Sequence, residues 1–539
     1  MKRSLPPFVL ALVAGIAAAA GMHAAVPGEE PRLLLNIVVE GLDAETLELL
    51  NEKFAPDGGF RKLRDGSITL SNADYGTYLD PTAAAAMLMT GAAPSVSGVA
   101  EAKIFDREKL RTLPLFHDPA VLGNFTSDTF SPAALRVSTI VDEARIASGG
   151  VNVAYALAPV ASQAIVLGGH TANSALWIDP AGANWASSTF YSDMPATVAS
   201  RNRMRPLATR MDTMSWTTLL PPAEYPALPE HLRKYPFRYV IPRGQQTAER
   251  VERLTASPMG NAEITDLAIE LIRGLSLGKH DGTDVLSLAY TLAPFPYTKS
   301  PDTRLERMDA YVRLDRDLGR LFRAADAPSG GRIAIMLGGT PAAPLSRRDD
   351  ERWAIPHGEF STRKAASLLN MYLIALHGNG DYVSGYHNDS FYLNHKTLKN
   401  KELRLDQVRA EVADFLVKMT GVEAAYTVED IIAGRAGHHS EALRRNTPLE
   451  TCGDVFLSIA PGFEVIDDLD GMNLSEAGVP MAHRAVSSTA PVYIFAPGVD
   501  PRTIDTPVDV RAVAPTLARI LRIRSPNGAA LPPLALRRP

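Results

Sequence analysis

Residues 33–39, LLLNIVV, form a near-continuous apolar run close to the start of the chain. Six apolar residues interrupted only by Asn36 are typical of a strand that is buried on both faces of a sheet. A helical pattern follows at 44–54, ahead of Gly58 and Gly59. A buried strand followed at once by a helix is the opening unit of an α/β domain.

Further apolar runs recur along the chain, at residues 151–157, 285–291, 332–337, 455–459 and 491–495. Helical patterns separate several of them, at residues 304–325, 362–376, 405–419 and 510–521. This alternation predicts an α/β fold with a mainly parallel central sheet. Ligands bind such sheets at the carboxyl ends of the strands. Any site is therefore expected at Glu40 and the segments 294–298 and 338–341.

The composition is that of a folded globular protein. Of 539 residues, 46% are hydrophobic and 21% are charged, which argues against a disordered chain or a coiled coil. The 55 basic and 60 acidic residues give a net charge of −5, so nucleic-acid binding through bulk positive charge is not expected. The single cysteine, Cys452, excludes an intramolecular disulfide and a cysteine-rich zinc site.

The first 25 residues have the pattern of an export signal. Lys2 and Arg3 precede residues 5–25, which carry no charge and become rich in alanine. This arrangement predicts a secretory signal peptide over 1–25, and hence a protein exported to the periplasm or cell surface. A retained membrane anchor is the alternative, because 21 uncharged residues could span a bilayer, and membrane contact is expected only in that case.

Several separated segments carry a resemblance to a known family. They are EGLDAETL at 40–47, TGAAPSVSGV at 90–99, GHTAN at 169–173, DAYVRLD at 309–315, GDV at 453–455 and VDVRAVAPTL at 508–517. In this order they resemble the secreted, phosphate-irrepressible alkaline phosphatases of bacteria, on the nucleotide-pyrophosphatase-like branch of the alkaline phosphatase superfamily. The resemblance covers nearly the whole mature chain.

The resemblance implies an alkaline-phosphatase-like three-layer sandwich with inserted cap segments. On that basis the sandwich core should occupy three parts, 26–177, 259–345 and 451–530. A cap insertion is expected at 178–258, where the sequence is rich in Pro, Met, Ser and Arg. A second, helical insertion is expected at 346–450, and 531–539 should form a tail.

The resemblance also implies a site, in which aspartates and histidines hold two zinc ions and a threonine between them attacks phosphorus. Here the nucleophile position falls on Pro81, with Thr82 one residue further on. Glu40 stands at the first metal position, and His483 is a candidate for the last histidine. The remaining matched positions hold no acid or histidine: Pro294, Thr298, Thr340 and Pro341 for the metals, and Ala102, Val160 and Ser162 for the substrate.

These replacements favour a secreted pseudoenzyme that binds an envelope protein or a small-molecule ligand, needs no cofactor and does not bind nucleic acid. Glu40 and His483 are then vestigial metal positions, and Thr82 caps the helix expected from 83–86. The alternative is an active, zinc-dependent phosphomonoesterase or phosphodiesterase that uses Glu40 and Thr82. A third possibility is a hydrolase with another nucleophile, such as Ser361 in the segment STRK. Four or more Asp and His side chains converging near Glu40 would favour a hydrolase.

Overall fold

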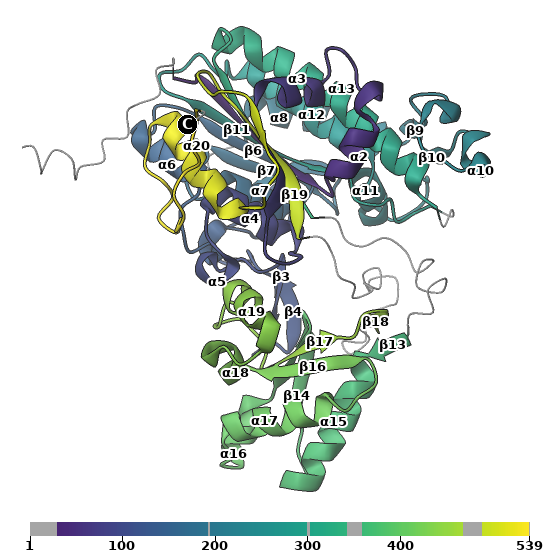
Figure 1. The fold of residues 1–539 in the computed structure, drawn as a ribbon, viewed down its shortest axis with the longest axis vertical. Helices are drawn as coiled ribbons and strands as arrows, with labels where there is room; N and C mark the ends of the chain where they lie inside the picture. Colours follow the sequence, from purple (N-terminus) through teal and green to yellow (C-terminus); the bar gives the residue numbers. More distant parts are fainter. Residues whose placement is uncertain (1–29, 192–193, 299–301, 342–357, 467–487, 538–539) are drawn as a thin grey trace, which may run out of the picture.

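The computed structural model describes residues 30–191, 194–298, 302–341, 358–466 and 488–537. The expected signal peptide and His483 lie outside these ranges. In the described part, 11 strands form one central sheet, in the order β20-β2-β19-β12-β1-β11-β6-β7-β8-β5, with β21 also paired to β2 (Figure 1). Their bounds are β1 (Leu33–Glu40), β2 (Ile68–Asp74), β5 (Gly123–Asn124), β6 (Ala154–Ala158), β7 (Ser174–Asp179), β8 (Asn184–Ser188), β11 (Asp284–Thr291), β12 (Ile333–Thr340), β19 (Thr489–Phe495), β20 (Arg502–Ile504) and β21 (Val508–Asp509).

The five strands β12-β1-β11-β6-β7 are parallel, and antiparallel strands flank them on both sides. β1 lies between β11 and β12 and is buried along both faces. Its side chains alternate, because Leu34 and Val38 belong to one apolar cluster while Leu33, Leu35 and Ile37 belong to the other. The predicted α/β fold with a mainly parallel central sheet is therefore confirmed, and residues 33–39 are its central strand.

Helices cover both faces of the sheet and give three layers (Figure 1). One face packs against α4 (Pro81–Thr90), α6 (Ile140–Ala147), α7 (Ala161–Gly168) and α20 (Val513–Leu521). The other face packs against α2 (Ala44–Leu49), α3 (Gly59–Gly66), α8 (Ala196–Met204), α11 (Thr247–Thr255), α12 (Pro258–Gly274) and α13 (Arg304–Ser329). The helix expected over 44–54 stops at Leu49, and a single 3-10 turn, Asn51–Lys53, follows it.

The segment expected to be a cap contributes to two different parts of the molecule. β8 belongs to the central sheet, so the sheet extends into the range 178–258. The rest of the range supplies α8 and α11, which pack on the sheet. It also forms a small hairpin, β9 (Ser215–Thr217) with β10 (Arg238–Val240), and the short helices α9 (Leu207–Arg210) and α10 (Glu230–Arg233). The side chain of Asp309 on α13 fastens this hairpin, since it accepts hydrogen bonds from Trp216 Nε1 at 2.6 Å and Tyr225 Oη at 2.6 Å.

Residues 358–466 form a second lobe with its own apolar cluster (Figure 1). Its sheet is antiparallel, in the order β14-β15-β17-β16. The run 455–459, expected in the core, is β17 of this second sheet, so the core resumes only with β19. The elements are β13 (Gly358–Ser361), α15 (Thr362–His377), β14 (Val383–His387), β15 (Ser390–Leu393), α16 (His395–Asn400), α17 (Leu405–Leu416), β16 (Val422–Thr427), α18 (Val428–Ala433), α19 (Ser440–Asn446), β17 (Val455–Ile459) and β18 (Phe463–Ile466).

A β-hairpin of the core contacts the second lobe. β3 (Lys103–Asp106) and β4 (Arg111–Pro114) follow the short helix α5 (Pro94–Ser97), and β3 packs near β14. Arg107 in this hairpin reaches into the lobe, where its guanidinium lies 2.8 Å from Asp454 Oδ2 and donates to the Cys452 carbonyl at 2.9 Å. Among the described residues, no helix is long and apolar enough to cross a membrane.

Candidate functional site

The candidate site lies where β1, β11 and β12 end and the helices α4 and α7 begin. In the strand register, Glu40 stands directly opposite Thr291 on one side and Thr340 on the other. The three residues therefore form a single row at the carboxyl edge of the parallel strands, where α/β sheets bind ligands. The row contains one carboxylate and two hydroxyls.

Glu40 is the titratable member of this row and is partly buried. Burial raises its pKa from 4.5 to about 7, because a charge is poorly solvated there. A hydrogen bond with the Thr291 side chain acts in the opposite direction, and the nearby charge of Asp80 raises the pKa further. Near neutral pH, Glu40 is thus divided between its neutral and charged forms.

The start of α4 holds a second carboxylate, that of Asp80, which is the N-cap of the helix. Its Oδ1 accepts a hydrogen bond from the Thr82 backbone N–H at 2.8 Å. Burial raises the pKa of Asp80, and hydrogen bonds from Thr82 and from the backbone N–H groups of Ala83 and Ala102 oppose that shift. The anion-binding end of α4 is therefore occupied by the protein's own carboxylate.

The prediction that Thr82 caps this helix is wrong. Asp80 supplies the cap, Pro81 occupies the first turn, and Thr82 lies inside the helix with only 2% of its surface exposed. Thr82 Oγ1 instead lies 3.0 Å from Ser162 Oγ, in the first turn of α7. Thr82 and one of the expected substrate positions, 80 residues apart in sequence, thus meet in the structure.

The loop after β11 is used for packing. Phe295 makes edge-to-face or tilted ring contacts with Trp216, Tyr239 and Tyr297, at ring-centroid distances of 5.3, 4.9 and 5.5 Å. The hydroxyl of Tyr239 lies 2.7 Å from Thr298 Oγ1 and 2.6 Å from Glu306 Oε1. The segment expected to be the first metal loop, with Pro294 and Thr298, therefore supports the cap hairpin.

The end of β12 likewise offers no strong metal ligand. Thr340 is buried, and its hydroxyl has no hydrogen-bond partner among the described residues. Pro341, which follows, has no side-chain donor atom. Ser361, the other candidate nucleophile, is the N-cap of α15 and accepts a hydrogen bond from the Lys364 backbone N–H at 3.2 Å.

A third acidic residue joins the site from the second-lobe side. Glu101 Oε2 lies 3.2 Å from His387 Nε2 on β14. Burial raises the pKa of Glu101, the contact with His387 lowers it, and the charges of Asp80 and Asp389 raise it again. The acidic groups of the site thus extend from Glu40 through Asp80 to Glu101.

Sequence reasoning found Glu40, Thr82 and Ser162 but missed Asp80, Glu101 and His387. The signal for Asp80 was present, because an Asp directly before a Pro is a frequent helix start. Glu101 and His387 carried no such signal, since their contact joins residues from two lobes. Their partnership depends on how the second lobe packs on the core.

The described residues do not fit a pair of zinc ions. Each zinc requires several carboxylate, imidazole or thiolate ligands at bonding distance. No group of three or more His, Cys, Asp and Glu side chains converges to hold a metal within the ranges described above. Of the five expected metal positions that fall on described residues, Glu40 is the only one with such a side chain, and the sixth, His483, lies outside the described residues.

Comparison with known proteins finds relatives that match almost the whole length of the chain. No protein-family model matches. The chain is 23% identical to the "Alkaline phosphatase PafA" of Elizabethkingia meningoseptica, over 95% of its own length and 94% of that protein. It is 22% identical to the "Alkaline phosphatase PhoV" of Synechococcus elongatus, over 93% and 91%, and 24% identical to a "Calcium-transporting ATPase" of Myroides odoratus, over 93% of each.

The solved structure of wild-type alkaline phosphatase PafA has the same fold. It superposes with a TM-score of 0.80 at 21% identity, covering 94% of this chain and 98% of that one. The match extends over both lobes, because almost the full length of each chain is included. The expected three-layer architecture is thereby confirmed.

Proposed function

The chain is a member of the alkaline phosphatase-like superfamily, and from this premise we propose that it is an exported pseudoenzyme that binds rather than hydrolyses. The observation that carries the proposal is the row at the strand ends. Where a dinuclear site needs several acids and histidines, the described residues offer Glu40 beside Thr291 and Thr340. Fold alone does not imply activity, so the side chains of the site decide.

The nucleophile position supports the same conclusion. Pro81 has no hydroxyl, and Thr82 is buried within α4 with its hydroxyl next to Ser162. An activated nucleophile needs a base within hydrogen-bond reach, about 2.6–3.2 Å. Thr82 Oγ1 lies beside the Ser162 hydroxyl, which is a poor base. The Asp80 carboxylate also bonds to the Thr82 side chain, but it already accepts the backbone N–H groups at the start of α4.

Electrostatics disfavour a phosphate ester as the ligand. Phosphatases offer cations and N–H groups to the phosphoryl oxygens. Here the N–H groups at the start of α4 are occupied by Asp80, and Glu40 and Glu101 add carboxyl groups, not cations, nearby. A neutral or cationic ligand, or a partner protein of the cell envelope, suits this site better than an anion.

Turnover and metal content test this proposal together. The mature protein, purified without chelators, is analysed for zinc and assayed on 4-nitrophenyl phosphate at pH 8 with excess zinc, beside PafA as the positive control. Wild type, Glu40→Ala and Thr82→Ala should give the same background rate. Pro81→Thr should recover nothing, because the parts of such a site act as a unit.

The opposite result is equally well defined. About two zinc ions per chain, together with turnover that Thr82→Ala abolishes, would establish a hydrolase that uses Glu40 and Thr82. Turnover lost in Ser361→Ala but not in Thr82→Ala would place the nucleophile in the second lobe. Either outcome refutes the pseudoenzyme.

Export is the second part of the proposal, and it is supported by the sequence pattern of residues 1–25. Cell fractionation should recover a chain shortened by the signal in the periplasm or at the surface. A full-length chain in the cytosol would contradict export without bearing on the chemistry of the site.

A further inference from the structure

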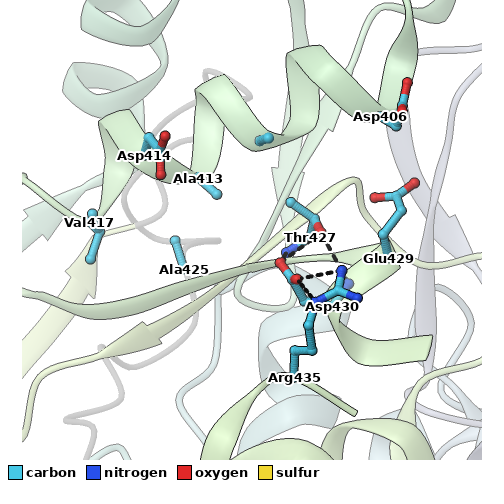
Figure 2. A pocket seen from close by; sticks show the side chains of 10 residues that line it. Asp406, Ala413, Asp414, Val417, Ala425, Thr427, Glu429, Asp430 and Arg435 are labelled. Atoms are coloured by element: carbon cyan, nitrogen blue, oxygen red, sulfur yellow. Dashed lines mark hydrogen bonds and ion pairs between the residues drawn. The ribbon is translucent and has the colours of Figure 1, made fainter. Parts of the chain in front are cut away.

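A groove in the second lobe lies beside a free sheet edge, far in sequence from the strand-end site (Figure 2). It has a volume of about 570 Å³ and lies between α17 and β16, with the start of α18 at one end. Its helical wall is one face of α17, because the residues that line it recur at intervals of three and four. They are Asp406, Ala410, Ala413, Asp414 and Val417.

The opposite wall is strand β16, whose alternate residues Ala425 and Thr427 line the groove. Among the described residues, β16 pairs with β17 on one side and with no strand on the other. An edge strand next to a helix-lined groove is the geometry by which protein domains bind extended peptides, through main-chain hydrogen bonds. The alanines in the walls leave room for the side chains of such a peptide.

Four acidic side chains and one basic side chain line this groove. Asp430 is committed to the fold, since it bonds to Thr427 and lies 2.9 Å from Arg435, as Figure 2 shows. Asp414 is exposed and makes no ion pair within the described part of the chain. Asp406 pairs with Arg404 at the exposed rim, where such a pair contributes little. The groove therefore presents carboxylates on the helical wall that faces the free edge.

We propose that this groove binds an extended, basic segment of a partner protein, which adds a strand to β16. Its backbone pairs with the open edge of β16, and its cationic side chains contact Asp406 and Asp414. A second copy of this chain is the less suitable occupant, because a symmetric β16–β16 contact would bring two acidic grooves together. The proposal is independent of whether the site at the strand ends hydrolyses phosphate esters.

The test uses the full mature protein and two labelled eight-residue probes, with blocked ends. One probe alternates lysine and valine, and the other alternates glutamate and valine. Fluorescence anisotropy at low and high salt measures binding to wild type, to Asp414→Lys and to Asp381→Lys. Asp381 is a matched control, because it is an exposed acid of the same lobe outside the groove.

The lysine probe should bind wild type and Asp381→Lys alike, and Asp414→Lys should weaken binding at least tenfold at low salt. Salt should reduce the difference, because exposed charges are screened. Hydrogen exchange should slow within residues 422–427 when the probe is bound, since strand addition protects the edge amides. The amides of Val422 and Thr427 are not expected to contribute, because they already donate hydrogen bonds inside the lobe. These results together support the proposal.

Each alternative outcome overturns it. Three results would show that the probe binds only non-specifically. They are equal binding of the glutamate probe, no effect of Asp414→Lys, and no protection of residues 422–427. If neither probe binds and Asp414→Ala makes the protein self-associate, the acidic side chains of the groove instead prevent aggregation through the open edge of β16. Concentration-dependent dimers of wild type would assign the groove to a second copy.

Discussion

Replacing Glu40 by glutamine should stabilise the protein, and increasingly so as pH rises from 4.5 through 7. The folded state holds the pKa of Glu40 at about 7, whereas the ordinary value is 4.5. Between these values the folded protein binds more protons than the unfolded chain, so its stability falls as pH rises from 4.5 through 7. The difference in pKa corresponds to about 3 kcal/mol, since one pKa unit is worth about 1.4 kcal/mol.

Glutamine has the same shape and stays neutral, so Glu40→Gln should remove this loss. At pH 8 the variant should be more stable by up to about 3 kcal/mol, or about 2–3 °C in melting temperature for a chain of this size. At pH 4.5, where Glu40 is neutral in the folded protein, the two should melt almost together. Thermal unfolding of wild type, Glu40→Gln and the exposed control Glu52→Gln at both pH values measures this.

A variant that is less stable than wild type at pH 8 would refute the reasoning, because Glu40 would then be a charged group with a favourable partner. The most informative form of that result is a wild type stabilised by added zinc and a variant that is not. Glu40 would then be a metal ligand, and both the pKa argument and its interpretation as a vestigial metal position would be wrong.

Three other substitutions test other parts of the structure by the same melts or by proteolysis. Asp80→Asn should keep the helix cap and reduce the loss of stability between pH 5 and 8, because it removes the charge that raises the pKa of Glu40. Ile37→Ala should cost about 3–4 kcal/mol, against almost nothing for the exposed Leu122→Ala, because Ile37 is completely buried in β1. Arg107→Ala should cost about 1–2 kcal/mol. The loss should show as faster proteolysis of the second lobe than in wild type at pH 7, and this difference should shrink as pH falls below 3.8, since Arg107 helps to hold the pKa of Asp454 far below that usual value.

The central strands could be predicted because their apolar runs are local and long. Residues 33–39 and 285–291 became adjacent parallel strands, as the continuous burial of both runs suggested. The run 455–459 has the same character but pairs with β15 and β16 in the second lobe. An apolar run shows that a strand is buried and does not show which sheet buries it.

The candidate site was predicted in part, for a similar reason. Glu40 could be placed because it directly follows the central strand, and the structure puts it in a row with Thr291 and Thr340. The role of Thr82 was mistaken because Asp80 caps the helix two residues earlier. The contact of Glu101 with His387 spans 286 positions and two lobes, and no local pattern specifies such a pair.

The position of β1 also determines when the sheet can form. Its two neighbours begin at Asp284 and Ile333, so both are made long after residues 33–40 leave the ribosome. At about 5–20 residues per second, the gap of 251 positions between paired residues takes roughly 12–50 s to synthesise. For that time the central strand has no hydrogen-bonding partner in the sheet, and its apolar side chains lack the neighbours that bury them in the folded protein. The first strand of the sheet to be synthesised is therefore paired late. Because of the strand order, β1 stays unpaired until more than half of the chain has been synthesised.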